Sequence, residues 1–268
     1  MPPLFELREV CFNYDGIAAL RGLSLQITQG ERVALLGANG SGKSTLLRIL
    51  DGLHLPSQGV VSFEGVALTS ECLEDDRFAL PFRRRVALVF PNPDMQLFNP
   101  TVFDEVAFAP LQLQWPKEKV MAAVNQTLEL MGISQLRDRP PYRLSSGEKK
   151  RVALASVIVL DPDVLLLDEP TATLDPRSQS QVIDLIQQWK GSSKTVVTAT
   201  HQLEIVEDIA DRICVLQAGN IAATGTPQEI LNHHELLLQA NLVHAHRHSH
   251  GAVTHSHPHI HTHSKHEH

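Results

Sequence analysis

Gly37-Ala38-Asn39-Gly40-Ser41-Gly42-Lys43-Ser44-Thr45 is the stretch that decides the fold of this chain. It fits the phosphate-loop pattern G-x-x-x-x-G-K-[ST], and its flanks fit the context that the pattern requires. Residues 32–36 predict a short buried strand, and residues 44–50 predict a helix that ends at Gly52. Backbone N–H groups of such a loop turn inward around phosphates, and the helix N-terminus favours their negative charge. The sequence therefore predicts a site for a nucleoside triphosphate.

Two acids end a second apolar strand. Residues 164–167 are Val-Leu-Leu-Leu, and Asp168 and Glu169 follow them. Acids often do no more than cap a strand end. Beside a phosphate loop, however, Asp168 can hold Mg²⁺ through water, and Glu169 can orient or deprotonate the attacking water. Ser44 and Asp168 are the predicted magnesium ligands, and Lys43 is the predicted cation near the terminal phosphates.

A third motif begins a predicted helix at residues 144–151, Leu-Ser-Ser-Gly-Glu-Lys-Lys-Arg. Ser145 is a good N-cap, and Glu148 three residues later completes a capping box. The cations at 149–151 oppose the helix macrodipole, so capping alone leaves them unexplained. A helix start made more positive suits an anion.

Together with the phosphate loop, this motif resembles the signature of ATP-binding-cassette (ABC) ATPases, which usually reads Leu-Ser-Gly-Gly and then Gln or Glu. Ser146 stands where that family usually has glycine. The resemblance covers about residues 4–235 and implies an α/β fold. That fold has a P-loop NTPase core with a mainly parallel sheet, an antiparallel β subdomain and an inserted helical subdomain at about residues 92–160. We expect an ATP-binding domain over 1–235 and a C-terminal extension over 236–268.

The resemblance also implies roles for single residues. Glu169, His201 and Lys43 would be catalytic, with His201 at the end of a strand over 195–200. Tyr14 would stack on adenine, and an ordinary tyrosine at a strand end is the alternative. Two ATPase subunits would close around two ATP molecules, and Asp175 would lie in the loop through which they communicate. Other positions complete the set: the loop residues Gly37, Ala38, Asn39, Gly40, Ser41, Gly42, Lys43, Ser44 and Thr45 would bind ATP, and Ser145, Ser146, Gly147 and Glu148 would act on the partner subunit's ATP.

A narrower resemblance follows from residues 86–102, where an apolar strand leads into Asn-Pro-Asp-Met-Gln-Leu-Phe. This segment is similar to the corresponding one in energy-coupling-factor ATPases, including those of cobalt and nickel importers. In that group the helical region after the loop grips a membrane subunit, so residues 92–110 are the predicted partner surface. Pro91 stands where the group has glutamine, and Gln96 is not an obvious substitute because the group usually has glutamine there too. Proline offers no side-chain amide and no backbone N–H.

The C-terminal residues 244–268 contain eleven histidines, mostly as His-x-His. Such a segment lacks the apolar content for a core, so we expect disorder without a ligand. Neutral imidazole binds nickel, cobalt, zinc and copper, although a purification tag or a solvated tail would look similar. The candidate transition-metal ligands are His244, His246, His248, His250, His255, His257, His259, His261, His263, His266 and His268.

Composition limits the partners. A net charge of −7 gives no electrostatic attraction to nucleic acid. The three cysteines lack the spacing of a disulfide framework or a zinc finger, which suits the cytosol. No apolar run approaches the roughly 20 residues that cross a bilayer. We therefore expect a peripheral protein on the cytoplasmic face of the cell membrane, paired with integral coupling and substrate-binding subunits.

The sequence thus predicts an ATP- and Mg²⁺-dependent ATPase, as a homodimer or with a paired ATPase subunit. We expect it to energise a membrane importer of nickel or cobalt ions. Two alternatives stay open at this point. One is a soluble ABC-type ATPase that acts on nucleic acid or ribosomes, and the other is an ATPase that mainly buffers or senses metal.

Overall fold

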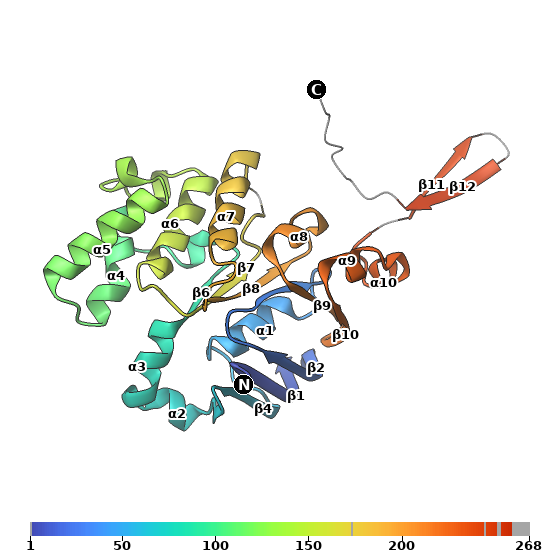
Figure 1. Cartoon of the computed structure of the whole chain (residues 1–268), viewed down its shortest axis with the longest axis horizontal. Helices are drawn as coiled ribbons and strands as arrows, with labels where there is room; N and C mark the ends of the chain where they lie inside the picture. Colours follow the sequence, from blue (N-terminus) through green and yellow to red (C-terminus); the bar gives the residue numbers. More distant parts are fainter. Residues whose placement is uncertain (1, 173, 244, 251–252, 259–268) are drawn as a thin grey trace.

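A six-stranded sheet forms the centre of the molecule, with the strand order β10-β9-β3-β8-β7-β6. The computed structural model describes residues 2–172, 174–243, 245–250 and 253–258 (Figure 1). All neighbours from β9 to β6 pair in parallel, and β10 pairs antiparallel with β9. The carboxyl ends of the parallel strands therefore share one edge. The strands are β3 (Arg32–Leu36), β6 (Val86–Val89), β7 (Val164–Asp168), β8 (Thr195–Thr200), β9 (Arg212–Gln217) and β10 (Asn220–Gly225).

A second, antiparallel sheet has the order β2-β1-β4-β5. Its strands are β1 (Phe5–Tyr14), β2 (Ile17–Ile27), β4 (Gln58–Phe63) and β5 (Val66–Ala67). Asp15 and Gly16 join β1 to β2, and both have positive φ, 45° and 85°. Two positive φ values are what a type I′ hairpin requires, and Asp-Gly is a preferred pair for it. The predicted mainly parallel sheet and antiparallel β subdomain are both confirmed.

The segment between β6 and β7 carries α4, α5 and α6, which pack on one another and lie together in green in Figure 1. Ser145 forms a capping box at α6, as the sequence predicts, and Thr101 caps α4. No helix in the described part of the chain is long and apolar enough to cross a membrane. The α-helices are α1 (Lys43–Leu50), α2 (Ser70–Glu74), α3 (Asp76–Arg85), α4 (Val102–Gln112), α5 (Lys117–Leu130), α6 (Ser146–Ile158), α7 (Pro176–Gln188), α8 (Val206–Ile209), α9 (Pro227–Leu231) and α10 (His234–Gln239), and the short 3₁₀ helices are η1 (Pro93–Met95), η2 (Ser134–Leu136), η3 (Pro141–Arg143) and η4 (Leu203–Ile205).

The central sheet separates two apolar cores. Along β3, Val33 and Leu35 belong to the core shared with α1 and the antiparallel sheet, whereas Ala34 and Leu36 belong to the core shared with α4 to α7. This alternation follows from the two-residue period of a strand. Both faces of β3 are covered, which is why its sequence is continuously apolar after Arg32.

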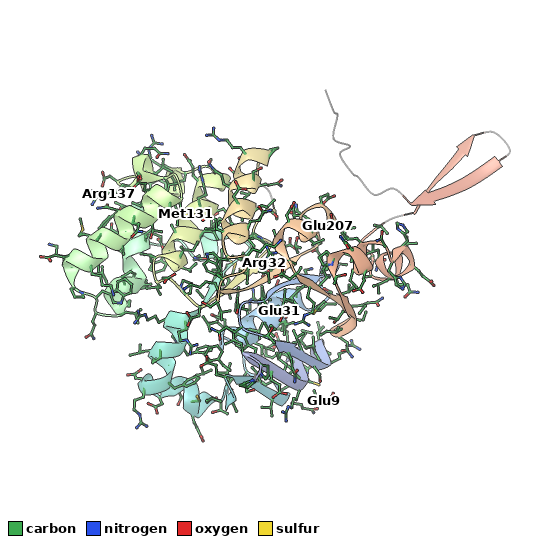
Figure 2. All side chains as sticks on the ribbon, viewed as in Figure 1. Glu9, Glu31, Arg32, Met131, Arg137 and Glu207 are labelled. Atoms are coloured by element: carbon green, nitrogen blue, oxygen red, sulfur yellow. The ribbon has the colours of Figure 1, made fainter. Side chains whose placement is uncertain are left out.

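Arg32 is the exception in this apolar environment, and Figure 2 labels it near the centre of the molecule. Its side chain is 1% exposed, and its Nη2 lies 2.7 Å from Asp211 Oδ1. Its Nε also donates to Asp211 Oδ2 at 3.2 Å, and its Nη1 donates to the Asp208 carbonyl at 3.1 Å. Burying a charge costs much less when it is paired in this way.

The histidine-rich segment contributes the strands β11 (Ala245–His250) and β12 (Val253–Pro258), which pair antiparallel with each other. In the described sheets they pair with no other strand. A lone two-stranded hairpin is marginally stable at best in water, so the expected disorder of this segment remains a prediction. His244, His259, His261, His263, His266 and His268 lie outside the described residues.

Candidate functional site

The loop at residues 37–42 is shaped by close contacts that only glycine allows. A Cβ on Gly37 would lie 2.5 Å from the Leu216 carbonyl and 2.6 Å from Ser41 Oγ. A Cβ on Gly42 would lie 2.8 Å from the Ala19 carbonyl, and its φ of 107° disfavours other residues. Gly42 precedes α1, so the loop delivers its backbone directly to a helix N-terminus. This is the geometry that binds phosphate groups.

Lys43 points back into this loop. Its Nζ donates to the carbonyls of Gly37 at 2.6 Å and Ala38 at 3.1 Å. The same Nζ lies 4.0 Å from Glu169 Oε1, and the side chain is 6% exposed. Burial lowers the pKa of Lys43, and the charges of Glu169 and Asp168 oppose that shift. The two carbonyls therefore hold the ammonium group beside the acid pair. A terminal phosphate can replace these carbonyls as the hydrogen-bond acceptor of Lys43.

Asp168 and Ser44 offer two oxygen ligands side by side. Asp168 is 3% exposed, and its Oδ1 is buried without a hydrogen-bond partner among the residues that the structure describes. Burial raises the pKa of Asp168, and a hydrogen bond with Ser44 opposes that shift. A buried, unsatisfied carboxylate oxygen is costly unless a cation or donor meets it. Hard oxygen ligands of this kind fit Mg²⁺, which usually keeps several waters and binds substrate phosphates as well.

Glu169 and His201 meet across the edge of the sheet. Glu169 Oε1 lies 2.8 Å from His201 Nδ1, and Thr200 donates to Glu169 Oε2 at 3.3 Å. Glu169 has a φ of 45°, a conformation that is uncommon for residues other than glycine. The Glu169 N–H donates to the Ala199 carbonyl at 2.9 Å, which holds this backbone in place. The carboxylate is thus aimed by β7 and oriented by the end of β8.

Tyr14 borders the same cleft, which measures about 470 Å³ and contains the phosphate loop, Pro91, Asp168 and Glu169 on its walls. Contacts with three residues orient this tyrosine, and none of them was predicted from the sequence. The His54 ring stacks on Phe12 with centroids 4.9 Å apart, and both rings meet Tyr14 edge-on. Arg48 Nη1 also donates to the Tyr14 hydroxyl at 3.3 Å. Because His54 follows α1 and Tyr14 ends β1, sequence spacing gave no signal of this contact.

The signature residues lie at the start of α6, against the start of α7. A Cβ on Gly147 would lie 2.8 Å from Ser178 Oγ and 3.5 Å from Asp175 Oδ2. Asp175 in turn caps α7, accepting hydrogen bonds from the N–H groups of Arg177 and Ser178. The structure therefore brings Gly147 and Asp175 together, as two neighbouring helix N-termini. None of Ser145, Ser146, Gly147 and Glu148 is among the residues that line the phosphate-loop cleft.

The loop after β6 is tied to α6. Gln96 Nε2 donates to the Ala153 carbonyl at 2.8 Å and to Ser156 Oγ at 3.0 Å, and Gln96 Oε1 accepts from the Phe90 N–H at 3.2 Å. These contacts engage both ends of the amide. Gln96 therefore ties the loop to α6. Because its amide is already bonded, Gln96 does not replace the side-chain amide that Pro91 lacks.

Comparisons with known proteins agree with this arrangement. The family model of the ABC transporter matches residues 20–172. The chain is 52% identical over 246 residues to the nickel import ATP-binding protein NikO of Rhodobacter capsulatus, covering 91% of this chain and 97% of that protein. It is 40% identical over 240 residues to the energy-coupling factor transporter ATP-binding protein EcfA of Methanothermobacter thermautotrophicus, covering 89% of this chain and 76% of that protein.

Solved structures give the same result. The fold matches cbiO1 from Clostridium perfringens, part of the ABC transporter complex cbiONQ, with a TM-score of 0.75 and 35% identity. That match covers 90% of this chain and 96% of cbiO1. A dimeric post-hydrolysis structure of the ATP-binding cassette MJ0796, with ADP and phosphate, matches with a TM-score of 0.73 and 26% identity. It covers 83% of this chain and 98% of MJ0796.

Proposed function

Because this chain belongs to the ABC transporter family, we propose that its ATPase cycle drives the import of nickel ions through membrane subunits. The chain is the transport-coupled ATPase subunit of an importer of the energy-coupling-factor type. Its 52% identity to a nickel import ATP-binding protein, over nearly the whole of both chains, is the observation that favours nickel as the cargo. Cobalt is the alternative cargo, because the segment at residues 86–102 resembles that of cobalt as well as nickel importers and the two ions have similar ligand chemistry.

The residues around the cleft have separate roles in the proposed mechanism. The phosphate loop binds the phosphates of ATP through backbone N–H groups, and Lys43 leaves the Gly37 and Ala38 carbonyls for the terminal phosphate. Ser44 and Asp168 would hold Mg²⁺, which neutralises charge on the phosphates. Glu169 accepts a proton from the attacking water, and His201, whose Nδ1 lies 2.8 Å from the Glu169 carboxylate, would hold that carboxylate and contact the terminal phosphate.

The position of the signature favours a site shared by two subunits. Ser145 and Gly147 are at the start of α6, outside the cleft that holds the phosphate loop of the same chain. A second ATPase subunit, packed head to tail, would add its own Ser145, Gly147 and Asp175 to this subunit's ATP. Closure of the pair would follow ATP binding, and hydrolysis would reopen it.

Residues 92–110 are the proposed docking surface for the membrane coupling subunit. Met95 and Phe98 are 63% and 67% exposed, and Phe98 packs edge-on against the half-exposed Phe108 with centroids 5.0 Å apart. Exposed apolar side chains grouped in this way favour a protein partner. The surface is continuous with the Gln96 tie to α6, so movement of α6 would reach the coupling subunit.

Uptake of radioactive nickel by cells with and without this subunit tests the proposal. Cells lacking it should regain uptake when they carry the wild-type chain, and should not regain it with Glu169→Gln, which keeps the fold but lacks the base. Cobalt uptake measured in parallel is the control for cargo. Restored cobalt uptake without nickel uptake would overturn the nickel assignment. Equal nickel uptake by all strains would overturn the importer role.

A further inference from the structure

Lys150 is a buried cation that the proposed mechanism does not use. It lies in the first turns of α6, next to the signature residues, and is 2% exposed. None of the ion pairs among the described residues includes it. An apolar side chain of similar length would fill the same space without the cost of burying a charge. Packing alone therefore gives no reason for a lysine at this position.

The contacts of Lys150 lead to the loop after β6. Its Nζ donates to the carbonyl of Phe90 at 3.0 Å and to the carbonyl of Pro91 at 3.0 Å. Proline has neither an N–H nor a polar side chain, so this carbonyl is the polar group that Pro91 can offer. Pro91 lines the phosphate-loop cleft together with Glu169, and it also lines a neighbouring hollow together with Ser146. Lys150 therefore binds the backbone of Pro91, a residue that lines one hollow with Ser146 and another with Glu169.

The ammonium group also lies within electrostatic reach of that acid pair. Burial lowers the pKa of Lys150 to about 8, and the charges of Asp168 and Glu169 oppose the shift. Two further ties join the same elements: Lys149 pairs with Asp94 at 2.7 Å, and Gln96 bonds Ala153 and Ser156. Of these three ties, Lys150 is the one that holds the carbonyl of Pro91 itself.

We propose that Lys150 is a positioning residue that couples α6, the helix that begins with the signature residues, to the loop after β6 of its own subunit. This loop contains Pro91 and is called the Pro91 loop below. The proposal rests on the two-subunit ATP site described above. When ATP on the partner subunit draws the start of α6 inward, the two hydrogen bonds from Lys150 carry the Pro91 loop with it. The loop then reaches its working position beside Glu169 only when the signature is engaged. Hydrolysis in one site is thereby made conditional on closure at the other.

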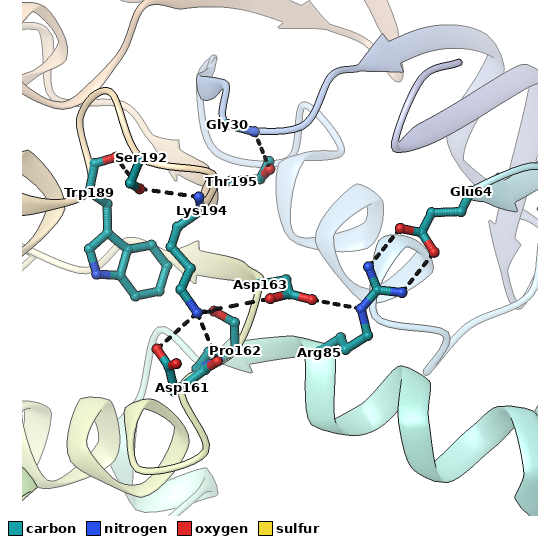
Figure 3. A network of polar contacts seen from close by, with 10 residues as sticks. All are labelled: Gly30, Glu64, Arg85, Asp161, Pro162, Asp163, Trp189, Ser192, Lys194 and Thr195. Carbon is teal, nitrogen blue, oxygen red and sulfur yellow. Dashed lines mark hydrogen bonds and ion pairs between the residues drawn. The ribbon is translucent and has the colours of Figure 1, made fainter. Parts of the chain in front are cut away.

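The chain contains a matched control in Lys194, which Figure 3 shows from close by. Its Nζ also donates to the carbonyls of two successive residues, the second of which is a proline: Asp161 at 2.9 Å and Pro162 at 2.8 Å. These contacts lie before β7 begins, at the opposite end of that strand from Asp168. Removing either ammonium group deletes two hydrogen bonds to successive carbonyls, and removing that of Lys194 also deletes its ion pairs with Asp161 at 2.8 Å and Asp163 at 3.9 Å. Of the two lysines, only Lys150 touches the loop that contains Pro91.

The experiment compares Lys150→Met, Lys150→Gln and Lys194→Met in the purified complete transporter, with Mg·ATP as substrate. We expect Lys150→Met to lower kcat about ten-fold or more, with KM for ATP changed by less than about two-fold, because misplacing a catalytic loop affects the transition state more than ground-state binding. Lys150→Gln keeps one amide donor and should lie between Lys150→Met and wild type. Lys194→Met should keep kcat within about two-fold of wild type. Thermal unfolding of each variant separates loss of stability from loss of turnover.

Several results would overturn the proposal. One is a kcat for Lys150→Met that equals that of Lys194→Met. Another is a rise in KM at unchanged kcat, which would mean that Lys150 supports ATP binding and not loop position. If Lys150→Met does not fold, a normal kcat in Lys150→Gln gives the same negative answer. The readout is ATP hydrolysis, so a wrong cargo assignment would leave this test unaffected.

Discussion

At the scale of single residues, Glu169 combines an unfavourable backbone with a well-held side chain. Its φ of 45° costs conformational energy, and the contacts with His201 and Thr200 fix the carboxylate that this backbone aims at the cleft. Strain that the surroundings maintain in this way is common at functional sites. We expect catalysis to depend on the carboxylate of Glu169 as a base, and not only on the shape of the side chain and its hydrogen bonds.

Glu169→Gln tests this point, because glutamine keeps the shape and loses the base. We expect ATP binding to persist, turnover to fall about 10²- to 10⁴-fold, and ATP to trap a closed pair of subunits. Steady-state hydrolysis and size-exclusion chromatography with ATP measure the two effects. Glu207→Gln on α8 makes the same chemical change away from the cleft and should behave as wild type. Near-normal turnover of Glu169→Gln would remove Glu169 from the catalytic role.

The Arg32–Asp211 pair predicts a pH dependence of stability. The hydrogen bond from Arg32 holds the pKa of Asp211 below its ordinary value of 3.8. Burial opposes this lowering of the pKa, and the charge of Lys190 adds to it. A lowered folded-state pKa means that this stabilisation is fully present above about pH 4 and is lost as the pH falls through the folded value. Asp211→Asn should lower the free energy of unfolding by about 2 kcal/mol at pH 7, because Arg32 stays buried with a weaker partner.

Urea unfolding between pH 3 and pH 7 measures this difference. The gap between wild type and Asp211→Asn should shrink below about pH 4. Asp184→Asn, on the exposed side of α7, is the matched control and should give no comparable gap. A gap that stays constant over the whole pH range would show that the pair contributes by packing and not by charge.

At the scale of secondary structure elements, the starts of α6 and α7 are packed so closely that Gly147 has no room for a side chain. Gly147→Ala would push a Cβ to 2.8 Å from Ser178 Oγ. We expect a loss of about 1–3 kcal/mol in unfolding free energy, together with reduced ATPase activity. The double variant with Ser178→Ala removes the hydroxyl that collides and should recover part of the stability. Failure to recover any would place the strain elsewhere in the helix.

The loop after β6 supplies a second prediction at this scale. Pro91→Gln would add the side-chain amide that Gln96 cannot provide, because both ends of the Gln96 amide are already bonded. The carbonyl at position 91 would remain for Lys150. We expect a higher kcat with little change in ATP affinity, the pattern of a transition-state effect. Equal or lower turnover in the complete transporter would mean that the surroundings have adapted to proline.

At the scale of the whole molecule, the folded core extends to the end of residue 243. Leu237, Ala240 and Val243 are buried in the core that α4 to α7 share with the central sheet. The phosphate loop, the acid pair and the signature all precede this point. A chain that ends at Val243 should therefore keep its fold and its basal ATPase activity, whereas nickel capture by the histidine-rich segment should be lost.

Calorimetric titration of both chains with nickel measures this capture. Binding to the full chain should weaken from pH 7.5 to pH 5, because imidazole, with an unperturbed pKa of about 6.5, must be neutral to bind a metal ion. Zinc and copper would compete at such a site. Equal nickel binding by both chains would show that the segment has no part in it, and lost ATPase activity on truncation would place the boundary elsewhere.

The sequence by itself determined the parts of this protein that depend on local patterns. The phosphate loop, the acid pair after β7 and the capping box at Ser145 each need only neighbouring residues, so spacing alone predicted them. The mainly parallel sheet was predicted from the resemblance to ABC ATPases that these motifs carry, and the pairing of β9, β3, β8, β7 and β6 agrees with it.

Only the tertiary structure decided which distant side chains meet. Lys150 bonds Pro91 from 59 positions away, His54 stacks on Phe12 beside Tyr14, and Gly147 packs on Ser178. None of these pairs has a sequence pattern, because the contact depends on the direction in which each side chain leaves its own element and on how those elements pack. In the sequence Lys150 was one of three unexplained cations, and burial beside a carbonyl of the ATP cleft is what distinguishes it from its neighbours.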